Sequence, residues 1–545
     1  MKKTIFTIFS FILVAQMAFA GGIVTNTNQS ASWVRMMARD ASVDVDAVFF
    51  NPAGLTHLDD GFYFQLNSQT VSQTRTVTST FPGLNNSKYT GETFVPFLPT
   101  AFAVYKKGKF AISGGFTVIG GGGSAEFDKG LPDFEYGISQ LPAALSGVGA
   151  KTGANLTVNG YEVDQYLKGS SSYLGFQGAF SYKINDVISV ALGARYVLSK
   201  NNYDGYIKSI MFDTPNGLVN GVDFMNSAKP VINGLATKLT SVTKIPDLLN
   251  PYLNDYGSAT LDQAKPILDQ LDPSYYPNLV AAGRLVGLSD PSKFTIKELN
   301  DKIVASTPEF NKNIAQLNGL ANADLSDKAL EVEQTGSGFT PFVSVDFDLG
   351  SLGFSAKYEM KTNMKVKTKV INDDFGLFKD GEEVPAEMPA MLALGARYNT
   401  GGLKFQTGFH YYFDKAAKYG KRNANGEFVT NGEEVNINGD KSYLSGNSIE
   451  FAIGAQYDIN SMFGLSAGFL MTKTHPNSIY QTSLSYSLPT KTFGFGAIIH
   501  ATSKIDIDLG ASFTSYDKYE KDFTAYKETY EKSAKIFAIG ATLKL

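Results

Sequence analysis

The chain has 545 residues, of which 43% are hydrophobic and 18% charged, with a formal net charge of -4 and no cysteine. This charge provides no basic surface for nucleic acid, so nucleic acid is excluded as an expected partner. The lack of cysteine excludes disulfides, thiol catalysis and thiolate metal sites, and no cofactor is expected.

The first segment reads as a secretory signal peptide over residues 1–20. Lys2 and Lys3 precede an apolar run that closes on the small residues Ala18 and Ala20, which suit a signal peptidase. After this segment, no stretch approaches the roughly 18 to 20 continuous apolar residues that a membrane helix requires. A membrane-spanning form of the mature chain would therefore cross with strands.

From residue 61 onward the sequence repeats segments in which large apolar side chains alternate with small or polar ones, which is the period of a β-strand. In residues 449–457, for example, Ile, Phe, Ile, Ala and Tyr alternate with Glu, Ala, Gly and Gln. Fourteen such strands are expected, near residues 62–76, 93–106, 109–119, 172–184, 187–199, 337–348, 353–369, 387–399, 403–415, 446–458, 462–474, 488–501, 505–518 and 533–545.

The connections between these strands alternate between short and long. Short turns such as residues 107–108 and 185–186 are followed by long links such as 120–171 and 200–336. Short periplasmic turns and long outer loops are typical of transmembrane barrels, in which closure removes the unpaired edges. The sequence therefore predicts an all-β, 14-stranded antiparallel transmembrane β-barrel.

The longest link, residues 200–336, carries helix signals. Thr260 with Gln263 and Thr295 with Glu298 have the spacing of capping boxes, and Thr307 followed by a proline predicts another helix start. We expect a large, partly helical extracellular loop.

Parity assigns the two faces of each strand. Tyrosines near strand ends, including Tyr182, Tyr196, Tyr398 and Tyr457, are expected on the lipid-facing side as an aromatic girdle. The opposite face is expected to line a polar, glycine-rich interior with Ser189, Arg195, Asp346, Arg397, Lys404, Gln406, His410, Glu450, Gln456, Asp506 and Asp508.

Ahead of the first strand, the motifs Arg39-Asp40-Ala41-Ser42 and Asn51-Pro52-Ala53-Gly54-Leu55 resemble the hatch segment of the FadL-type long-chain fatty acid and hydrocarbon transporters. The resemblance implies an N-terminal hatch over residues 21–60 that plugs a barrel formed by residues 61–545. In that family, outer loops collect an apolar substrate, a lumenal pocket holds it, and hatch movement with a kink in the third strand releases it sideways.

The chain departs from the family in two respects. The link at 200–336 is much longer, and Leu545 stands where a terminal aromatic is usual. The outward apolar pattern from Phe537 to Leu545 still suits the outer-membrane barrel assembly machinery as a partner.

Two groups of residues are candidates for gating. Asn51, Pro52, Ala53 and Gly54 are assigned to the hatch, with a turn that introduces the first strand as the alternative. The run Gly120-Gly121-Gly122-Gly123 closes the third strand and is the candidate for lateral opening, because glycine weakens pairing in a strand. The alternative is that the four glycines begin a flexible outer loop.

Arg195, Arg397 and Lys404 are candidates for binding the head group of a ligand, because a carboxylate in a confined site needs a cation. The alternative is that these cations pair with carboxylates of the wall, such as Asp346 or Glu450. Catalysis is not expected: the four histidines show no metal-ligand spacing and no nucleophile elbow is present.

These observations predict a monomeric channel in the outer membrane of a Gram-negative cell, embedded in its lipid, for passive uptake of hydrophobic molecules such as long-chain fatty acids. Two alternatives remain open. One is a surface adhesion or host-interaction protein that uses the large outer loop, and the other is a general porin.

Overall fold

The computed structural model describes residues 26–545, so the expected signal peptide over 1–20 lies outside the described residues. The described chain divides into two compact units. The helical unit comprises residues 136–163 and 208–327, and the barrel unit comprises residues 26–135, 164–207 and 328–545. Each unit is described by itself below.

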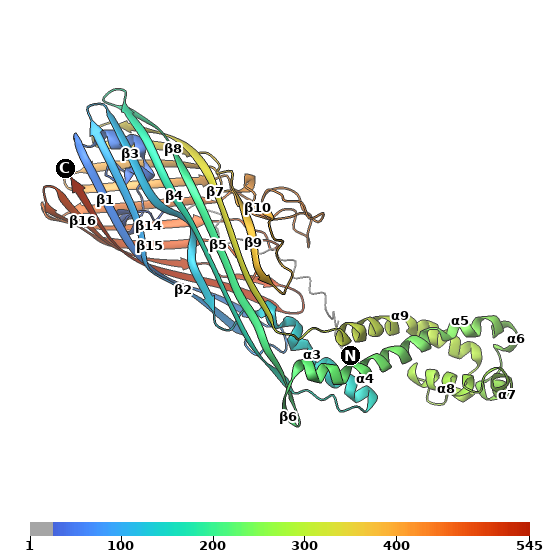
Figure 1. Cartoon of the computed structure of the whole chain (residues 1–545). Helices are drawn as coiled ribbons and strands as arrows, with labels where there is room; N and C mark the ends of the chain where they lie inside the picture. Colours follow the sequence, from blue (N-terminus) through green and yellow to red (C-terminus); the bar gives the residue numbers. More distant parts are fainter. Residues whose placement is uncertain (1–25) are drawn as a thin grey trace. The chain divides into compact units, whose positions relative to one another are not determined.

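The barrel is a single antiparallel sheet that closes because β18 pairs with β1 along almost its whole length (Figure 1). Its strands are β1 (Gly61–Ser79), β2 (Lys88–Lys107), β3 (Phe110–Phe127), β4 (Gly160–Lys183), β5 (Ile188–Thr214), β7 (Lys328–Asp348), β8 (Leu352–Glu359), β9 (Lys365–Asp373), β10 (Glu383–Pro385), β11 (Met391–Thr400), β12 (Leu403–Tyr412), β13 (Ile449–Asp458), β14 (Phe463–Lys473), β15 (Thr490–Thr502), β16 (Ile505–Tyr516), β17 (Tyr519–Asp522) and β18 (Lys527–Lys544).

These segments form the fourteen strands of the barrel, which confirms the predicted count, because three barrel strands are each interrupted and carry two labels. Strands β8 and β9 pair with successive parts of β7 and together make one barrel strand. Strands β10 and β11 pair with β9 and β8 and together make the next one. Likewise β17 continues β16 along β18.

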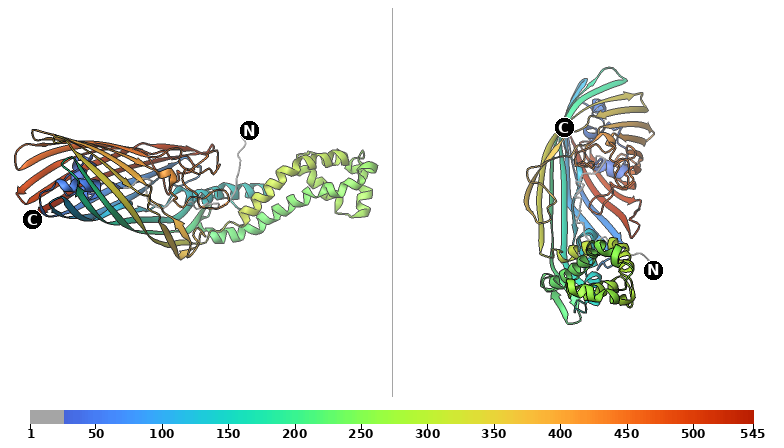
Figure 2. Two further views of the ribbon diagram at one scale, coloured as in Figure 1. Left: turned by 90° about the horizontal axis from the view of Figure 1, so that it is seen from above. Right: turned by 90° about the vertical axis from the view of Figure 1, so that its right-hand side faces the viewer.

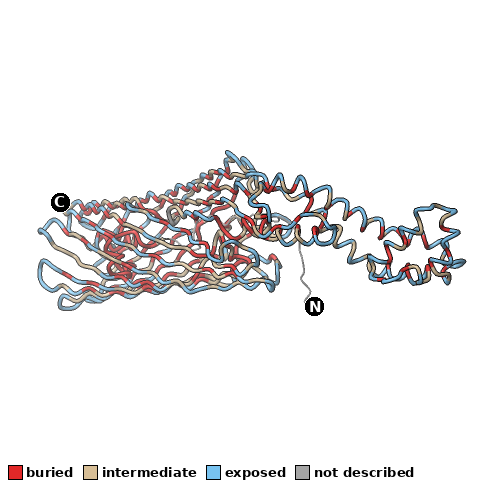
Figure 3. The backbone as a smooth tube through the Cα atoms, turned by 90° about the horizontal axis from the view of Figure 1, so that it is seen from below, coloured by how far each residue is buried: buried red, intermediate tan, exposed pale blue. Residues whose placement is uncertain are grey.

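The outer surface of the barrel is apolar. Large side chains such as Leu66 and Leu192, each 66% exposed, and Phe339, 58% exposed, lie on this surface, whereas alternate residues are buried. Buried and exposed positions therefore alternate along the strands (Figure 3). Tyr182, Tyr196, Tyr398 and Tyr457 are exposed on this surface, as the girdle prediction requires. Within residues 26–545, no helix has the length and apolar character needed to cross a membrane.

Residues 26–60, which we call the hatch, lie inside the ring of strands and form three short helices (Figure 2). Helix α1 (Ala31–Met36) is capped by Ser30, whose Oγ accepts from the Trp33 amide at 2.9 Å; it is followed by α2 (Ala47–Phe50) and the 3-10 helix η1 (Pro52–His57).

Glycines in the wall make room for α1. A Cβ at Gly454 or at Gly468 would lie 2.0 Å from the carbonyl oxygen of Met36, far inside van der Waals contact. The glycines that crowd the inward face therefore let the wall approach the hatch backbone.

The helical unit contains most of the helices found within residues 26–545. They are α4 (Gly221–Thr243), α5 (Ile245–Leu249), η2 (Asn250–Tyr252), α6 (Leu253–Tyr256), α7 (Leu261–Leu271), α8 (Tyr275–Leu285), η3 (Pro291–Lys293) and α9 (Ile296–Ala321), preceded by the short strand β6 (Gly217–Asn220). Helix α3 (Pro132–Thr152) begins in the barrel unit and continues in the helical unit, and η4 (Asp414–Ala416) follows β12.

The two capping boxes, at Thr260 and at Thr295, are confirmed. The helix start predicted at Thr307 is wrong, because α9 runs through this position and the Thr307 hydroxyl donates back to the Ile303 carbonyl at 2.9 Å.

Strands extend further into the long link than the sequence pattern indicated. Strand β5 continues to Thr214 and β7 begins at Lys328, inside the range of 200–336 that the sequence assigned to a loop. In these extensions polar residues such as Asn202 and Asp204 occupy positions of the outward face. The alternation of apolar and polar residues that marks a strand in the sequence is therefore lost, although β5 and β7 remain hydrogen-bonded to each other.

Candidate functional site

The wall of the barrel is interrupted between β2 and β3. The ladder runs from Lys107 and Phe110 to the pair Ala101 and Phe116, and resumes only at Glu92 and Glu126. Eight residues of β2 and nine of β3 lie between these pairs. We call residues 93–100 and 117–125 the seam.

Both strands of the seam contain residues that disfavour pairing. Pro96 and Pro99 in β2 have no N–H to donate to a ladder. On β3, the register with β4 shifts on either side of Gly120, and Gly121 has a φ of +84°, where a Cβ would lie 2.3 Å from the Ser171 carbonyl oxygen. The run Gly120 to Gly123, the predicted lateral-opening candidate, lies wholly within the seam.

The beginning of the hatch takes the place of the missing pairing. The Gln29 side chain accepts from the Val118 amide at 3.0 Å and donates to the Val118 carbonyl at 2.7 Å, while the Asn26 amide donates to the Ile119 carbonyl at 2.9 Å. On the other side of the seam, the Thr100 hydroxyl of β2 donates to the Gln29 carbonyl at 2.7 Å. Gln29 therefore bridges β2 and β3 through hydrogen bonds to both.

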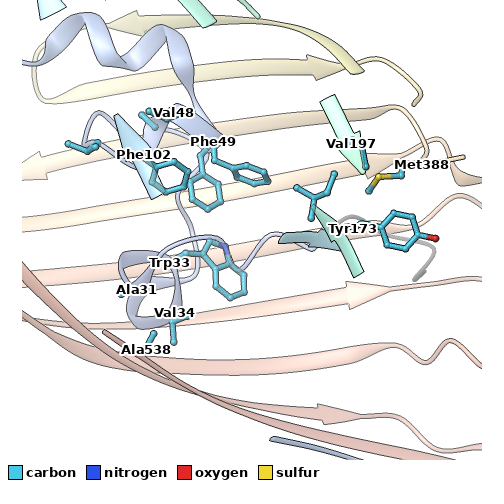
Figure 4. Close-up of a cluster of buried hydrophobic side chains, with 14 of the residues drawn as sticks. Ala31, Trp33, Val34, Val48, Phe49, Phe102, Tyr173, Val197, Met388 and Ala538 are labelled. Carbon is cyan, nitrogen blue, oxygen red and sulfur yellow. The ribbon is translucent and has the colours of Figure 1, made fainter. Parts of the chain in front are cut away.

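An apolar cluster connects the hatch with the seam. Trp33, Val48 and Phe49 of the hatch pack among inward side chains of the wall, including Phe102 of β2, Tyr173 of β4 and Val197 of β5 (Figure 4). Ile119, in the seam itself, belongs to the same cluster and is fully buried. The interior is thus lined by apolar residues from the hatch to the interruption in the wall.

The motif Asn51-Pro52-Ala53-Gly54 fixes the other end of the hatch to the wall. The Asn51 side chain donates to Asp346 at 2.7 Å, the Pro52 carbonyl accepts from Ser181 at 2.7 Å, and the Ala53 amide donates to Ser344 at 3.0 Å. At Gly54 a Cβ would lie 2.4 Å from the Ser42 carbonyl oxygen, so no side chain fits.

Buried ion pairs bind the middle of the hatch to the polar side of the wall. Arg35 donates from Nε to Asp508 at 2.7 Å and from Nη1 to Gln456 at 2.6 Å. Asp40 and Glu450 lie on opposite sides of the His410 ring, at 2.7 and 2.9 Å from its two nitrogens. Each of these residues is buried, so the contacts are protected from solvent.

The three cations proposed for a ligand head group each have a carboxylate partner. Arg195 forms two hydrogen bonds to Glu359, at 2.9 and 2.8 Å. Arg397 pairs with Asp346 at 2.7 Å, and Lys404 lies 3.1 Å from Asp458. These are wall contacts of the type that the alternative interpretation expected.

Sequence reasoning missed Asn26, Gln29 and the seam itself. Two prolines within an otherwise central strand, Pro96 and Pro99, were the available signal, because proline is normally confined to edges of sheets. Asn26 and Gln29 carried no local signal, because their partners lie about ninety residues away in the chain.

No group of His, Asp or Glu suited to a metal occurs in the part of the chain that the structure describes.

Comparison with known proteins found no matching family model and no matching curated protein. Solved structures do match. A Pseudomonas aeruginosa FadL homologue is 12% identical, with a TM-score of 0.55, over 95% of this chain and 99% of its own. A deletion mutant of the monoaromatic hydrocarbon channel TodX is 13% identical, with a TM-score of 0.52, over 95% of this chain and 100% of its own. The Pseudomonas putida toluene transporter TodX is 13% identical, with a TM-score of 0.50, over 96% and 99%. The resemblance inferred from the hatch motif is thereby confirmed at the level of the fold.

Proposed function

We propose that this chain, which has the fold of the FadL homologues and hydrocarbon channels, is an outer-membrane channel for passive uptake of hydrophobic molecules such as long-chain fatty acids. The observation that carries the proposal is the seam, an interruption of the barrel wall that Gln29 of the hatch bridges and whose β3 side Asn26 also contacts. A general porin has no need of an interior filled by a hatch and lined by apolar side chains at its wall.

The proposed path begins at the outer loops, which capture the molecule. The apolar cluster around Phe49 and Trp33 then holds it, and withdrawal of Asn26 and Gln29 opens the seam. The molecule leaves sideways into the lipid. This route avoids transfer of the tail into water, which costs about 0.8 kcal/mol for each methylene group. Gating by Asn51 to Gly54 belongs to the same proposal, because these residues anchor the end of the hatch that stays in place.

The proposed setting is the outer membrane of a Gram-negative cell, in which the chain is a monomer surrounded by lipid. The outward, exposed side chains of Phe537, Ile539 and Leu543 on β18 suit insertion by the barrel assembly machinery. The proposal requires no cofactor and no catalytic group.

A head group could reach Arg195 or Arg397 only by displacing the carboxylate partner of that buried cation, whereas the Lys404 side chain is 43% exposed and could bind a head group beside Asp458. Removing one partner from a buried ion pair costs several kcal/mol, so such an exchange requires an anionic ligand that replaces the lost interaction. The ligand would then be coupled to the hatch, because Asp346 pairs with Arg397 and also accepts from Asn51.

The experiment has two arms. Mass spectrometry of organic extracts of the purified barrel identifies molecules that copurify with it, and uptake of labelled oleate is measured in a strain that depends on this chain for transport. We expect extracted lipids or hydrocarbons, and saturable oleate uptake that becomes unregulated or is lost without residues 21–60. Recovery of no apolar molecule together with free passage of sugars would overturn the proposal in favour of a porin.

A further inference from the structure

The helices of the helical unit leave a hollow of about 740 Å³ between α4, α5, α7, α8 and the beginning of α9. Its base consists of buried aliphatic side chains, among them Leu249, Leu268 and Leu279, which belong to the core of the unit. All of the lining residues fall between Lys238 and Ile296, so the hollow belongs entirely to this unit. We call the hollow together with its exposed rim the groove.

The rim of the groove is apolar as well. Six large apolar side chains of the lining are each 38–53% exposed, namely Leu248, Tyr252, Tyr256, Ile267, Leu271 and Leu285. An occupant that filled only the hollow would leave this surface in water, so an occupant that covers all of it has to extend over the rim. Apolar patches that contain tyrosines are typical of the cores of protein–protein interfaces. The rim therefore favours a folded protein segment over a small molecule.

A helix is the kind of segment that suits this surface. Addition of a strand requires a free sheet edge, but every residue that lines the groove lies on a helix. An amphipathic helix instead inserts large apolar side chains, spaced at positions i, i+3 or i+4, and i+7, into a groove between helices. The groove therefore fits recognition of a helix.

The charge of the lining has one sign. Lys238 on α4 and Arg284 on α8 are the only charged residues that line the groove, and no carboxylate does. Both are exposed, and neither forms an ion pair within residues 26–545. By contrast, Lys293 and Lys297 of the same unit pair with aspartates at 3.0 and 2.7 Å. Carboxylates on an incoming helix would supply the missing partners.

We propose that the groove is the docking site of a partner protein, which inserts an acidic amphipathic helix. The apolar face of that helix covers the rim formed by α5, α7 and α8, and its acidic residues lie beside Lys238 and Arg284. The occupant is a macromolecular partner and not a transported molecule. The proposal uses neither the seam nor the hatch, so it does not depend on the proposed function.

The first experiment presents helices of controlled composition to the groove. The probe is a phage-displayed library of short helical peptides in which apolar spacing and charge are varied, and the target is the full-length protein in lipid nanodiscs. We expect the selected peptides to combine large apolar residues at i, i+4 and i+7 with acidic residues, because the groove offers apolar surface and two unpaired cations. Selection of basic or uncharged peptides would overturn the acidic assignment, and failure to enrich any helical peptide would overturn the docking site.

Variants of the full-length chain assign the binding to the groove. Ala281→Phe places a ring in the hollow at an exposed lining position and should weaken binding of a selected peptide at least tenfold. Val304→Phe, on the exposed part of α9 outside the lining, should leave the affinity unchanged. Lys238→Gln with Arg284→Gln should weaken binding by about tenfold at low salt and by less at high salt, because salt screens exposed ion pairs. Equal affinity for Ala281→Phe and the unmodified chain would place the peptide outside the groove.

The second experiment identifies the occupant in the cells that make the protein. The photoactivatable residue p-benzoylphenylalanine replaces Leu271 on the rim or, as the control, Val304 outside the groove, and mass spectrometry identifies the cross-linked segment after illumination. We expect the variant at Leu271 to cross-link to an acidic helical segment of another protein, and the variant at Val304 not to do so. Cross-links to lipid, to a second copy of this chain, or equally from both positions would each overturn the proposal.

Discussion

Gln29 is the residue at which the hatch and the seam are most directly coupled, so Gln29→Ala tests the gating argument. The substitution removes the acceptor of the Val118 amide and a donor to the Val118 carbonyl, while the carbonyl keeps its bond from Asn26 at 3.1 Å. Gln29 is 1% exposed, so water does not replace the lost amide at once. The backbone contact from Thr100 to the Gln29 carbonyl is not altered by the change in side chain.

The magnitude follows from the bonds that are lost. A buried amide left without a partner costs about 1–3 kcal/mol, and a neutral hydrogen bond that disappears costs about 0.5–1.5 kcal/mol. The closed state of the seam should therefore lose roughly 1.5–4.5 kcal/mol relative to the open state. Because about 1.4 kcal/mol corresponds to a factor of ten, the population of the open seam should rise roughly 10- to 1,600-fold.

Hydrogen exchange at the Asn26 amide measures this population, because its bond to the Ile119 carbonyl at 2.9 Å is retained in Gln29→Ala and breaks when the beginning of the hatch leaves β3. The control is Thr56→Val, which removes a buried hatch hydroxyl bonded to Ser189 on β5 at 2.6 Å and leaves the seam intact. We expect exchange at the Asn26 amide to accelerate at least tenfold in Gln29→Ala and to remain unchanged in Thr56→Val. Equal rates in Gln29→Ala and the unmodified chain would refute the role assigned to Gln29.

Three further predictions concern the hatch and the outer loops. Gly468→Ala should displace α1, because the new Cβ would collide with the Met36 carbonyl, and proteolysis of the hatch should accelerate in that variant. Asp346→Ala leaves Arg397 buried without its nearest carboxylate and should destabilise the barrel by about 3–5 kcal/mol in urea titrations. Asp346→Ala with Arg397→Met should reverse this effect only in part, because Asn51 and His57 also lose their bonds to Asp346. Burial lowers the pKa of Lys421, in the loop after β12, from 10.5 to about 7. Between about pH 7 and pH 10.5 the folded loop therefore binds fewer protons than the unfolded loop, and the stability of the folded loop rises with pH. Lys421→Met should therefore slow hydrogen exchange in residues 413–448 most at or below pH 7 and have little effect near pH 10.5; a constant effect across this range would contradict the assignment.

The barrel was predictable because each strand carries its own signal. The alternation at residues 449–457, for example, reports that one face meets lipid and the other the interior, and it needs no knowledge of neighbouring strands. The capping boxes at Thr260 and Thr295 are equally local. The helix start predicted at Thr307 was wrong because a threonine before a proline marks a start only where no helix already runs through that position, and α9 does so here.

The candidate site was only partly predictable, because it is made by contacts between distant segments. The motif beginning at Asn51 identified the hatch, but its bond to Asp346 spans 295 positions. The inward positions of Arg195 and Arg397 were predicted correctly by parity, whereas their carboxylate partners depended on the register of neighbouring strands. The seam depends on a register as well, so the glycines alone could not distinguish an opening from the start of a loop.

The unequal strength of the hatch contacts determines which part of the hatch can move. Its middle is held by buried hydrogen bonds between charged groups, such as Arg35 with Asp508 at 2.7 Å, each worth about 1.5–3 kcal/mol. Its beginning is held by neutral hydrogen bonds from Asn26 and Gln29, each worth about 0.5–1.5 kcal/mol. Under the proposed function, a bound ligand should therefore release the beginning first. Since Gln29 in that segment also bridges the seam, the least costly movement of the hatch is then the one that opens the seam, and the charged contacts need not break.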